Sequence, residues 1–120
     1  MNKKVKKLTL YYNPHCSTCH KAYDIAKGQK CEIELIEYLN DTPTEKELKE
    51  LLKKLGLKAE DLLRKKEALY QEKYKDKKLT NAQWIKVMHK NPILIERPVA
   101  VYGNRALIGR PPERIIDLLK

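Results

Sequence analysis

The sequence predicts an α/β fold in which a small mixed sheet is interrupted by a helical segment. Three observations support this prediction. The first third of the chain alternates strand and helix patterns, the middle carries only helical patterns, and the end reads as a hairpin followed by a helix. The expected order is therefore βαβ, a helical insert, then ββα. With 120 residues, we expect one domain covering residues 1–120, with the insert at about residues 43–91.

The first third of the chain holds a strand, a turn, a helix and a second strand. Leu8–Tyr12 is a short apolar run typical of a strand, and Asn13-Pro14 indicates a turn. A helix is predicted to follow and to end before Gly28, because glycine commonly follows a helix C-terminus. Residues 31–35 alternate apolar and polar side chains, which predicts the second strand.

The predicted insert begins with a strong helix start. Thr42 is expected to cap the helix, Pro43 suits its first position, and Glu45 would complete a capping box with Thr42. Leucines at helical spacing follow, and Gly56 is expected to end the helix. A second short helix is predicted at residues 59–64.

The rest of the chain reads as a capped helix, a hairpin and a last helix. Thr80 and Gln83 predict the cap of the first of these, which Pro92 should bring to an end. Strands are predicted at residues 99–102 and 105–108, because the Gly-Asn pair between them is a hairpin turn. A helix with an apolar face then closes the chain.

The stretch between the first strand and the first helix carries a candidate nucleophile. Cys16 lies where the strand gives way to a helix beginning near Ser17, so unpaired backbone N–H groups converge there. The helix dipole favours negative charge, which makes the nucleophilic thiolate more accessible at neutral pH. Cys19 follows one helical turn later, within reach of an oxidised Cys16. The two cysteines have the spacing of a redox pair.

Three other interpretations of these cysteines remain open. A zinc site usually needs a second pair of ligands at similar spacing, and the remaining candidates form none: Cys31, His15, His20 and His89. The run from Cys16 to His20 also matches the C-x-x-C-H haem-attachment pattern, but we see no secretory signal peptide that would take the chain to an oxidising compartment. The third possibility is two buried thiols near a helix start. We expect no bound metal and favour the nucleophile.

The amino-acid composition limits which binding partners and which cellular compartment we expect. The net charge of +10 favours anionic partners, and lysines cluster twice: Lys3, Lys4, Lys6 and Lys7, then Lys73, Lys75, Lys77 and Lys78. We find no nucleic-acid recognition motif, so nucleic acid is not an expected partner. An odd number of cysteines without an apparent export signal predicts a reducing, cytoplasmic location. No apolar run approaches the roughly 20 residues of a membrane span, so none is predicted.

Arginine is scarce in this chain, where lysine carries most of the positive charge. The planar guanidinium grips an oxyanion through two parallel hydrogen bonds, which an ammonium cannot do. Arg97 and Arg110 flank the predicted hairpin and each precedes a proline, so we expect them at a binding site. A structural interpretation is open for the other three, with Arg64 and Arg114 on helix surfaces and Arg105 at a strand edge.

Four stretches spread over nearly the whole chain resemble a known family: Tyr12-Asn13-Pro14-His15-Cys16, Leu62-Leu63-Arg64-Lys65, residues 91–98, and Ile108-Gly109-Arg110-Pro111-Pro112-Glu113. Together they resemble the glutaredoxin-coupled arsenate reductases and the related Spx-type proteins, which have a thioredoxin-like fold. The resemblance implies that Cys16 is the nucleophile toward arsenate. It also implies that Arg64, Arg97 and Arg110 form an oxyanion cradle and that a cis peptide precedes Pro98.

Two departures from the family pattern stand out. Arsenate reductases of this class typically have a Gly-Thr-Ser run after the nucleophile, where this chain has Ser17-Thr18-Cys19. They also have a histidine four residues before the nucleophile, where this chain has Tyr12. The C-x-x-C resembles the Spx side of the family, whereas Arg110 in Gly-Arg-Pro-Pro resembles the reductase side. We therefore expect a reductase.

The expected function is thiol-dependent reduction of arsenate or a related oxyanion. Cys19 is a candidate resolving cysteine, and Cys31 is expected to be a core thiol. We expect no bound cofactor, with glutathione and glutaredoxin, or thioredoxin, as external reductant. Two alternatives stay open: an Spx-type redox-switched regulator that binds RNA polymerase, and a general C-x-x-C dithiol oxidoreductase with no oxyanion substrate.

Overall fold

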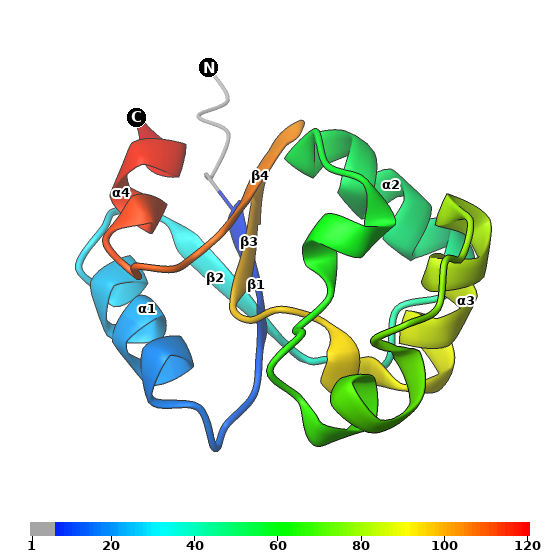
Figure 1. The fold of residues 1–120 in the computed structure, drawn as a ribbon. Coiled ribbons are helices and arrows are strands. Elements are labelled where there is room, and N and C mark those ends of the chain that lie inside the picture. The colour runs from blue at the N-terminus through cyan, green and yellow to red at the C-terminus, as the bar shows by residue number, and fades with distance from the viewer. Residues whose placement is uncertain (1–6) are drawn as a thin grey trace. The chain divides into compact units, whose positions relative to one another are not determined.

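The computed structural model describes residues 7–120, so Lys3, Lys4 and Lys6 of the first lysine cluster lie outside the described part (Figure 1). The chain divides into two compact units. The sheet unit comprises Met1–Tyr38 and Arg97–Lys120, and the helical unit comprises Leu39–Glu96. The helical unit contains the helices predicted as an insert.

The sheet unit is a four-stranded mixed sheet with two helices. The strands lie in the order β2-β1-β3-β4, in which β1 runs parallel to β2 and antiparallel to β3, and β3 and β4 form a hairpin. This arrangement confirms the predicted α/β fold with its βαβ and ββα halves. The elements are β1 (Lys7–Tyr12), α1 (Ser17–Lys27), β2 (Glu32–Glu37), β3 (Val99–Tyr102), β4 (Arg105–Ile108) and α4 (Arg114–Leu119).

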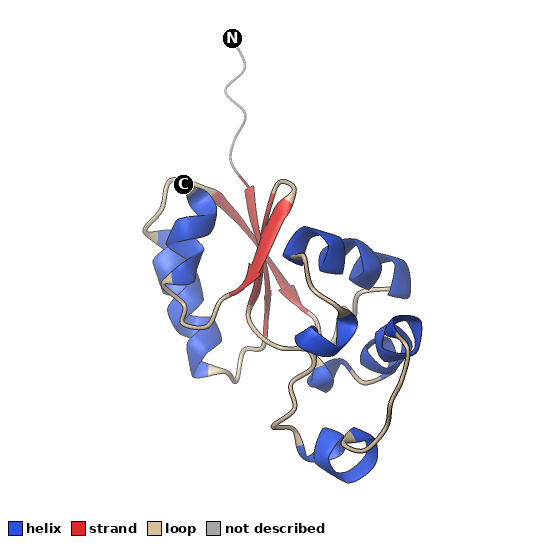
Figure 2. Cartoon of the chain, turned by 45° about the horizontal axis from the view of Figure 1, so that its top comes forward, coloured by secondary structure: helices blue, strands red, loops and turns tan. Residues whose placement is uncertain are grey.

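The core of this unit lies between the sheet and its two helices. Figures 1 and 2 show α1 and α4 side by side on one face of the sheet. The residues of β1 that face them are fully buried, and the core cluster consists of Leu8, Leu10, Ala22, Ala26, Ala100, Ile115 and Leu118. Burying apolar side chains from four separate segments fixes α1 against the sheet, and with it the loop that precedes α1.

The helical unit contains two α-helices and three short helical turns. They are α2 (Glu45–Leu55), α3 (Asn81–Lys90), the 3₁₀ turns η1 (Ala59–Leu62) and η3 (Pro92–Leu94), and the π-helical turn η2 (Tyr70–Tyr74). Thr80 and Gln83 form the predicted capping box of α3, and Gly56 ends α2 with a positive φ of 67°. The π-helical turn was not predicted. None of the helices within residues 7–120 is long and apolar enough to cross a bilayer.

The start of α2 differs from the prediction. The N-cap is Thr44, whose hydroxyl accepts from the Glu47 N–H at 3.1 Å while the Glu47 carboxylate accepts from the Thr44 N–H at 2.9 Å. The prediction of Thr42 as cap, with Pro43 inside the helix, is wrong. The carbonyl of Pro43 is in a hydrogen bond with His89 Nδ1 at 2.8 Å, which holds it outside the helix.

Candidate active site

The loop between β1 and α1 is held by Asn13, which is buried. Its carbonyl accepts from the Cys16 N–H at 3.0 Å, and its side-chain oxygen accepts from the His15 N–H at 2.9 Å. His20, on the first turn of α1, contacts the carbonyl of Pro14 through Nε2. These contacts place Cys16 at the N-cap of α1, as predicted, with its side chain half-buried.

Arg110 lies against the sulfur of Cys16. Its Nη2 is 3.6 Å from Cys16 Sγ, its Nη1 is 3.4 Å from the Thr18 hydroxyl, and its Nε donates to the carbonyl of Arg97 at 2.7 Å. Burial opposes ionisation of Cys16. This effect is outweighed by hydrogen bonds from the backbone and thiol of Cys19 and from Arg97, and by the charge of Arg110. The pKa of the Cys16 thiol therefore lies below its usual value of 9.0.

Cys19 has the opposite character. It is fully buried, and burial together with the adjacent Cys16 raises its pKa to about 12. The Asn13 N–H points to Cys19 Sγ at 3.5 Å, and Cys16 and Cys19 are both free thiols. The two sulfurs thus form a pair in which Cys16 is the more acidic group and Cys19 holds a proton.

Arg97 and Tyr38 form the inner side of the site. The Arg97 side chain acts on both neighbours: it helps to lower the pKa of the Cys16 thiol, and its charge opposes the rise in the pKa of Tyr38. Tyr38 is fully buried just beyond the end of β2, and burial raises its pKa to about 12, so it stays protonated. No functional role was predicted for Tyr38, because a tyrosine at the end of an apolar strand pattern is typical of a core residue.

Antiparallel pairing explains why two arginines distant in sequence meet at one sulfur. Val99 of β3 pairs with Ile108 of β4, so the residues just outside this pair lie at the same edge of the sheet. These outer segments carry Arg97 and Arg110. β1 pairs with the same end of β3, and the loop that holds Cys16 leaves the sheet there. The hairpin therefore brings both arginines near the sulfur of Cys16.

A close backbone approach supports the arginine pair. The Gly109 N–H donates to the carbonyl of Pro98 at 2.8 Å, and a Cβ on Gly109 would lie 3.0 Å from Pro98 Cγ. Glycine is therefore favoured here, since a side chain would push the two segments apart. The Arg97–Pro98 peptide is cis, as expected, and so is Arg110–Pro111.

Arg64, predicted for the site, and Cys31, predicted as a core thiol, each have contacts of their own. Arg64 belongs to the helical unit, where its guanidinium pairs with Glu67 at 3.3 Å and Glu96 at 3.8 Å. Cys31 is half-buried, with Sγ 3.8 Å from the carbonyl of Ala26, and burial raises its pKa. That placement fits a core thiol.

The remaining arginines bind backbone carbonyls. Arg105 donates to the carbonyl of Leu118 at 2.8 Å, close to the end of α4. Arg114 donates to the carbonyl of Ile108 at 3.0 Å. Both contacts agree with the structural interpretation and place these two guanidinium groups on carbonyl oxygens.

A mixed β2-β1-β3-β4 sheet with a C-x-x-C at the start of its first helix defines a thioredoxin-like protein with a polarised thiol. Residues 11–118 match the ArsC family, and the chain belongs to that family. The match covers both units and all the cysteines and arginines discussed above.

Named relatives and solved structures agree with this membership. The chain is 38% identical over 116 residues to the Escherichia coli K12 protein named "Uncharacterized protein YfgD", which covers 95% of this chain and 98% of the relative. It is 34% identical over 113 residues to an E. coli protein named arsenate reductase, covering 93% of this chain and 80% of the relative. The structure named arsenate reductase from Vibrio cholerae superposes with a TM-score of 0.89 at 34% identity, covering 95% and 98% of the two chains.

Proposed function

We propose that this protein reduces arsenate, or a closely related oxyanion, with Cys16 as nucleophile and an arginine cradle for the anion. The observation that carries the proposal is the contact of Arg97 and Arg110 with the Cys16 sulfur. A sulfur of lowered pKa beside two guanidinium groups suits attack on an anionic electrophile. The names of the relatives favour arsenate as that electrophile.

The arginines solve the main electrostatic problem of the reaction. A thiolate and an arsenate oxyanion repel each other, and guanidinium groups placed between them lower that repulsion as the two approach. Arg110 has no carboxylate partner among residues 7–120, so its charge remains available to the anion. That Arg64 joins the cradle stays a prediction from the family resemblance; within the helical unit its guanidinium pairs with Glu67 and Glu96.

The first chemical step joins sulfur to arsenic. The Cys16 thiolate attacks arsenic(V), a sulfur–arsenic bond forms and one arsenic–oxygen bond breaks. The departing oxygen takes up a proton from solvent and leaves as water, and arsenic remains pentavalent. This step needs a thiolate at neutral pH, which the lowered pKa of Cys16 supplies.

The second step reduces arsenic with Cys19 as resolving thiol. The Cys19 thiol gives its proton to an oxygen of the arsenic group and attacks Cys16 Sγ, a disulfide forms, and arsenic keeps the electron pair of the broken sulfur–arsenic bond and leaves as arsenite, arsenic(III). The two sulfurs lose the two electrons that arsenic gains. Cys19 is protonated at rest first because burial raises its pKa and also because of the adjacent Cys16 charge. Once the Cys16 sulfur is bonded to arsenic that charge is gone, and the Asn13 N–H remains to stabilise a Cys19 thiolate.

An external thiol completes the cycle. Thioredoxin or glutaredoxin would reduce the Cys16–Cys19 disulfide, and glutathione with glutaredoxin would resolve the Cys16 adduct directly. No bound cofactor is required by this scheme. Three free thiols suit a reducing compartment, and we place the reaction in the cytoplasm.

The test is arsenate-dependent turnover of the purified protein, supplied separately with glutathione plus glutaredoxin and with thioredoxin. Cys16→Ser should abolish turnover with both donors, because no other group forms the sulfur–arsenic bond. Cys19→Ser should keep activity with glutathione and glutaredoxin but lose it with thioredoxin alone. Cys31→Ser is the matched control and should keep both. Wild-type protein that is inactive with both donors would contradict the proposed function.

A further inference from the structure

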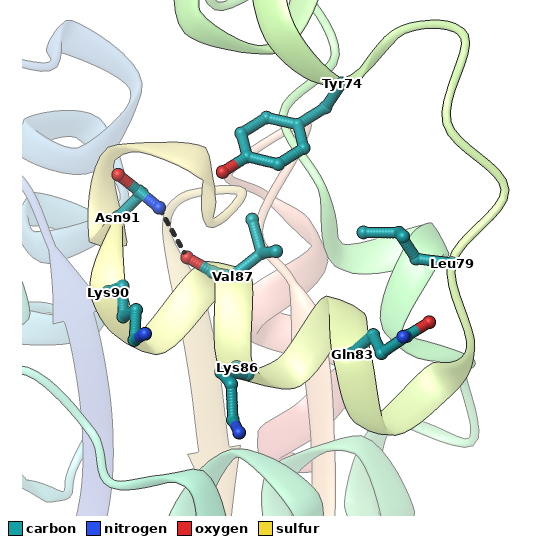
Figure 3. A pocket seen from close by; sticks show the side chains of 7 residues that line it. All are labelled: Tyr74, Leu79, Gln83, Lys86, Val87, Lys90 and Asn91. Atoms are coloured by element: carbon teal, nitrogen blue, oxygen red, sulfur yellow. Dashed lines mark hydrogen bonds between the residues drawn. The ribbon is translucent and has the colours of Figure 1, made fainter.

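The helical unit contains a pocket that takes no part in the chemistry above. It has a volume of about 290 Å³ and opens on the surface of α3 (Figure 3). Val87 lies in its middle, with Tyr74 and Leu79 on one side and Lys86 and Lys90 on the other. One side of the pocket is therefore apolar and the opposite rim is cationic.

The apolar wall is held in place by aromatic contacts. The Tyr74 ring packs edge to face on the ring of Trp84, with centroids 5.9 Å apart. Lys77 Nζ lies 5.4 Å from the centroid of the Tyr74 ring. Tyr74 ends the π-helical turn η2, whose Tyr70 also packs on Trp84 at 6.3 Å. Such turns often occur at functional sites. A preformed wall costs an entering apolar group little ordering entropy.

The cationic rim has no ion-pair partner in the described part of the chain. Among residues 7–120, neither Lys86 nor Lys90 forms an ion pair, and both side chains are exposed. No carboxylate lines the pocket. The amides of Gln83 and Asn91 add neutral hydrogen-bonding groups, with Asn91 Nδ2 already donating to the Val87 carbonyl at 3.0 Å. Charge complementarity therefore calls for an anionic ligand with an apolar group.

The surroundings of the pocket favour an extended ligand over a small molecule. Its volume falls just below the roughly 300–1,000 Å³ of small-molecule pockets and suits a single anchoring side chain. The segment that joins Tyr74 to Leu79 borders the pocket and carries exposed lysines: Lys75, Lys77 and Lys78. A small ligand would leave those charges unused, whereas a chain of carboxylates would meet them.

We propose that this pocket binds an acidic peptide segment of a partner protein. One apolar or aromatic side chain of the segment packs over Val87 against Tyr74, and flanking carboxylates pair with Lys86 and Lys90. A nucleic acid fits less well, because Glu72 and Asp76 alternate with the lysines of the neighbouring segment. A phosphate backbone carries a charge at every nucleotide and would meet these two carboxylates as well as the lysines, while a peptide can place its carboxylates beside the lysines.

The fluorescence of Trp84, the only tryptophan in the chain, reports on the pocket because the Tyr74 ring lies against it. The probe is a blocked heptapeptide with a central phenylalanine flanked by three aspartates on each side, titrated into the full chain at low salt. The comparison probes are the same peptide with a central alanine, its lysine counterpart, and a single-stranded oligonucleotide. The phenylalanine peptide should bind most tightly and the lysine peptide should not bind.

The test variant is Lys86→Glu with Lys90→Glu, and the matched control is Lys49→Glu with Lys53→Glu. The control pair is exposed, has the same i, i+4 spacing on α2 and changes the net charge equally. The test variant should bind the phenylalanine peptide at least about tenfold more weakly, since two ion pairs are lost. The control should bind within about twofold of wild type.

Four results would overturn the proposal: no phenylalanine-peptide binding up to about millimolar concentration, equal binding of the alanine peptide, equal loss in the control variant, or tighter binding of the oligonucleotide. Far-ultraviolet circular dichroism of both variants verifies that they are folded. The readout is independent of arsenate reduction, so it stands or fails separately from the proposed function.

Discussion

The sheet unit and the helical unit use arginine in opposite ways. In the sheet unit, the Arg110 guanidinium points to the Cys16 sulfur and the Thr18 hydroxyl, with no carboxylate partner among residues 7–120. In the helical unit, Arg64 lies between Glu67 and Glu96. A guanidinium that is neutralised by two carboxylates mainly stabilises the fold. A guanidinium that points at a sulfur polarises the thiol and can bind an anion.

The two units are also assembled differently. Strand pairing between distant segments builds the sheet unit, as when β1 pairs with β3 across the whole insert. The helical unit relies more on local contacts, such as the capping boxes at Thr44 and Thr80. Changes in the sheet unit should therefore alter the reactivity of Cys16, while changes in the helical unit should alter stability first.

The largest expected effect is the contrast between the two cysteines of the sheet unit. Because the pKa of Cys16 lies below 9.0 and that of Cys19 is about 12, their thiolate fractions at about pH 8 differ at least several-hundredfold. As pH falls below 9.0, Cys16 should keep its reactivity down to its own lowered pKa, while Cys19 stays protonated. Brief alkylation followed by peptide mapping should label Cys16 alone. In denaturant, which removes the difference, both should be labelled; equal labelling of the native protein would contradict the assignment.

The comparison of arginines gives the next largest effect. Arg110→Ala should raise the pKa of Cys16 and lower kcat/KM for arsenate by about a hundredfold, the scale of removing one preorganised transition-state donor. Arg110→Lys should recover little, since an ammonium lacks the fork. Arg64→Ala removes two ion pairs of the helical unit, so it should lower the free energy of unfolding and leave the pKa of Cys16 unchanged. The pKa is read from alkylation rate against pH; an equal pKa shift in both variants would erase the distinction between the units.

A smaller effect is expected at Tyr38. Tyr38→Phe removes a buried hydroxyl that interacts electrostatically with Arg97 and keeps the ring, so Arg97 should be held less firmly near Cys16. Loss of this polar group should reduce kcat/KM by about two- to tenfold and raise the pKa of Cys16 slightly. Tyr23→Phe is the control and should leave both unchanged, because Tyr23 of the same unit packs against the core cluster and its ring contacts Lys27. A Tyr38→Phe protein with wild-type kinetics and pKa would show that Arg97 needs no such support.

The smallest effect is expected in the helical unit. Thr44→Ala removes the cap of α2 and should lower the free energy of unfolding by about 1 kcal/mol, measured by urea denaturation. Thr44→Ser keeps the hydroxyl and should remain close to wild type. Neither variant should change the alkylation rate of Cys16. A shift in that rate without loss of stability would mean that α2 acts on the site.

Local sequence was sufficient where a single residue type decides the backbone. Gly56 and Gly103 have the positive φ values that their predicted roles require, and Thr80 caps α3 as expected. Prediction from local sequence failed where two N-cap positions were possible. At the start of α2, Thr42 and Thr44 each have a glutamate three residues later. The contact between His89 and Pro43, 46 residues apart, accompanies the later start. The π-helical turn at Tyr70 likewise rests on packing against Trp84, which apolar spacing does not report.

The sequence by itself determined that a cysteine would stand at a strand-to-helix junction, and that two arginines would flank a hairpin. Both follow from patterns within a few residues. Only the tertiary structure decided that Arg110 and Arg97 reach Cys16, and that Cys19, chemically identical, keeps its proton. The reason is that a thiol pKa depends on desolvation and on charges brought close by the fold, and strand pairing brings together groups more than 90 residues apart.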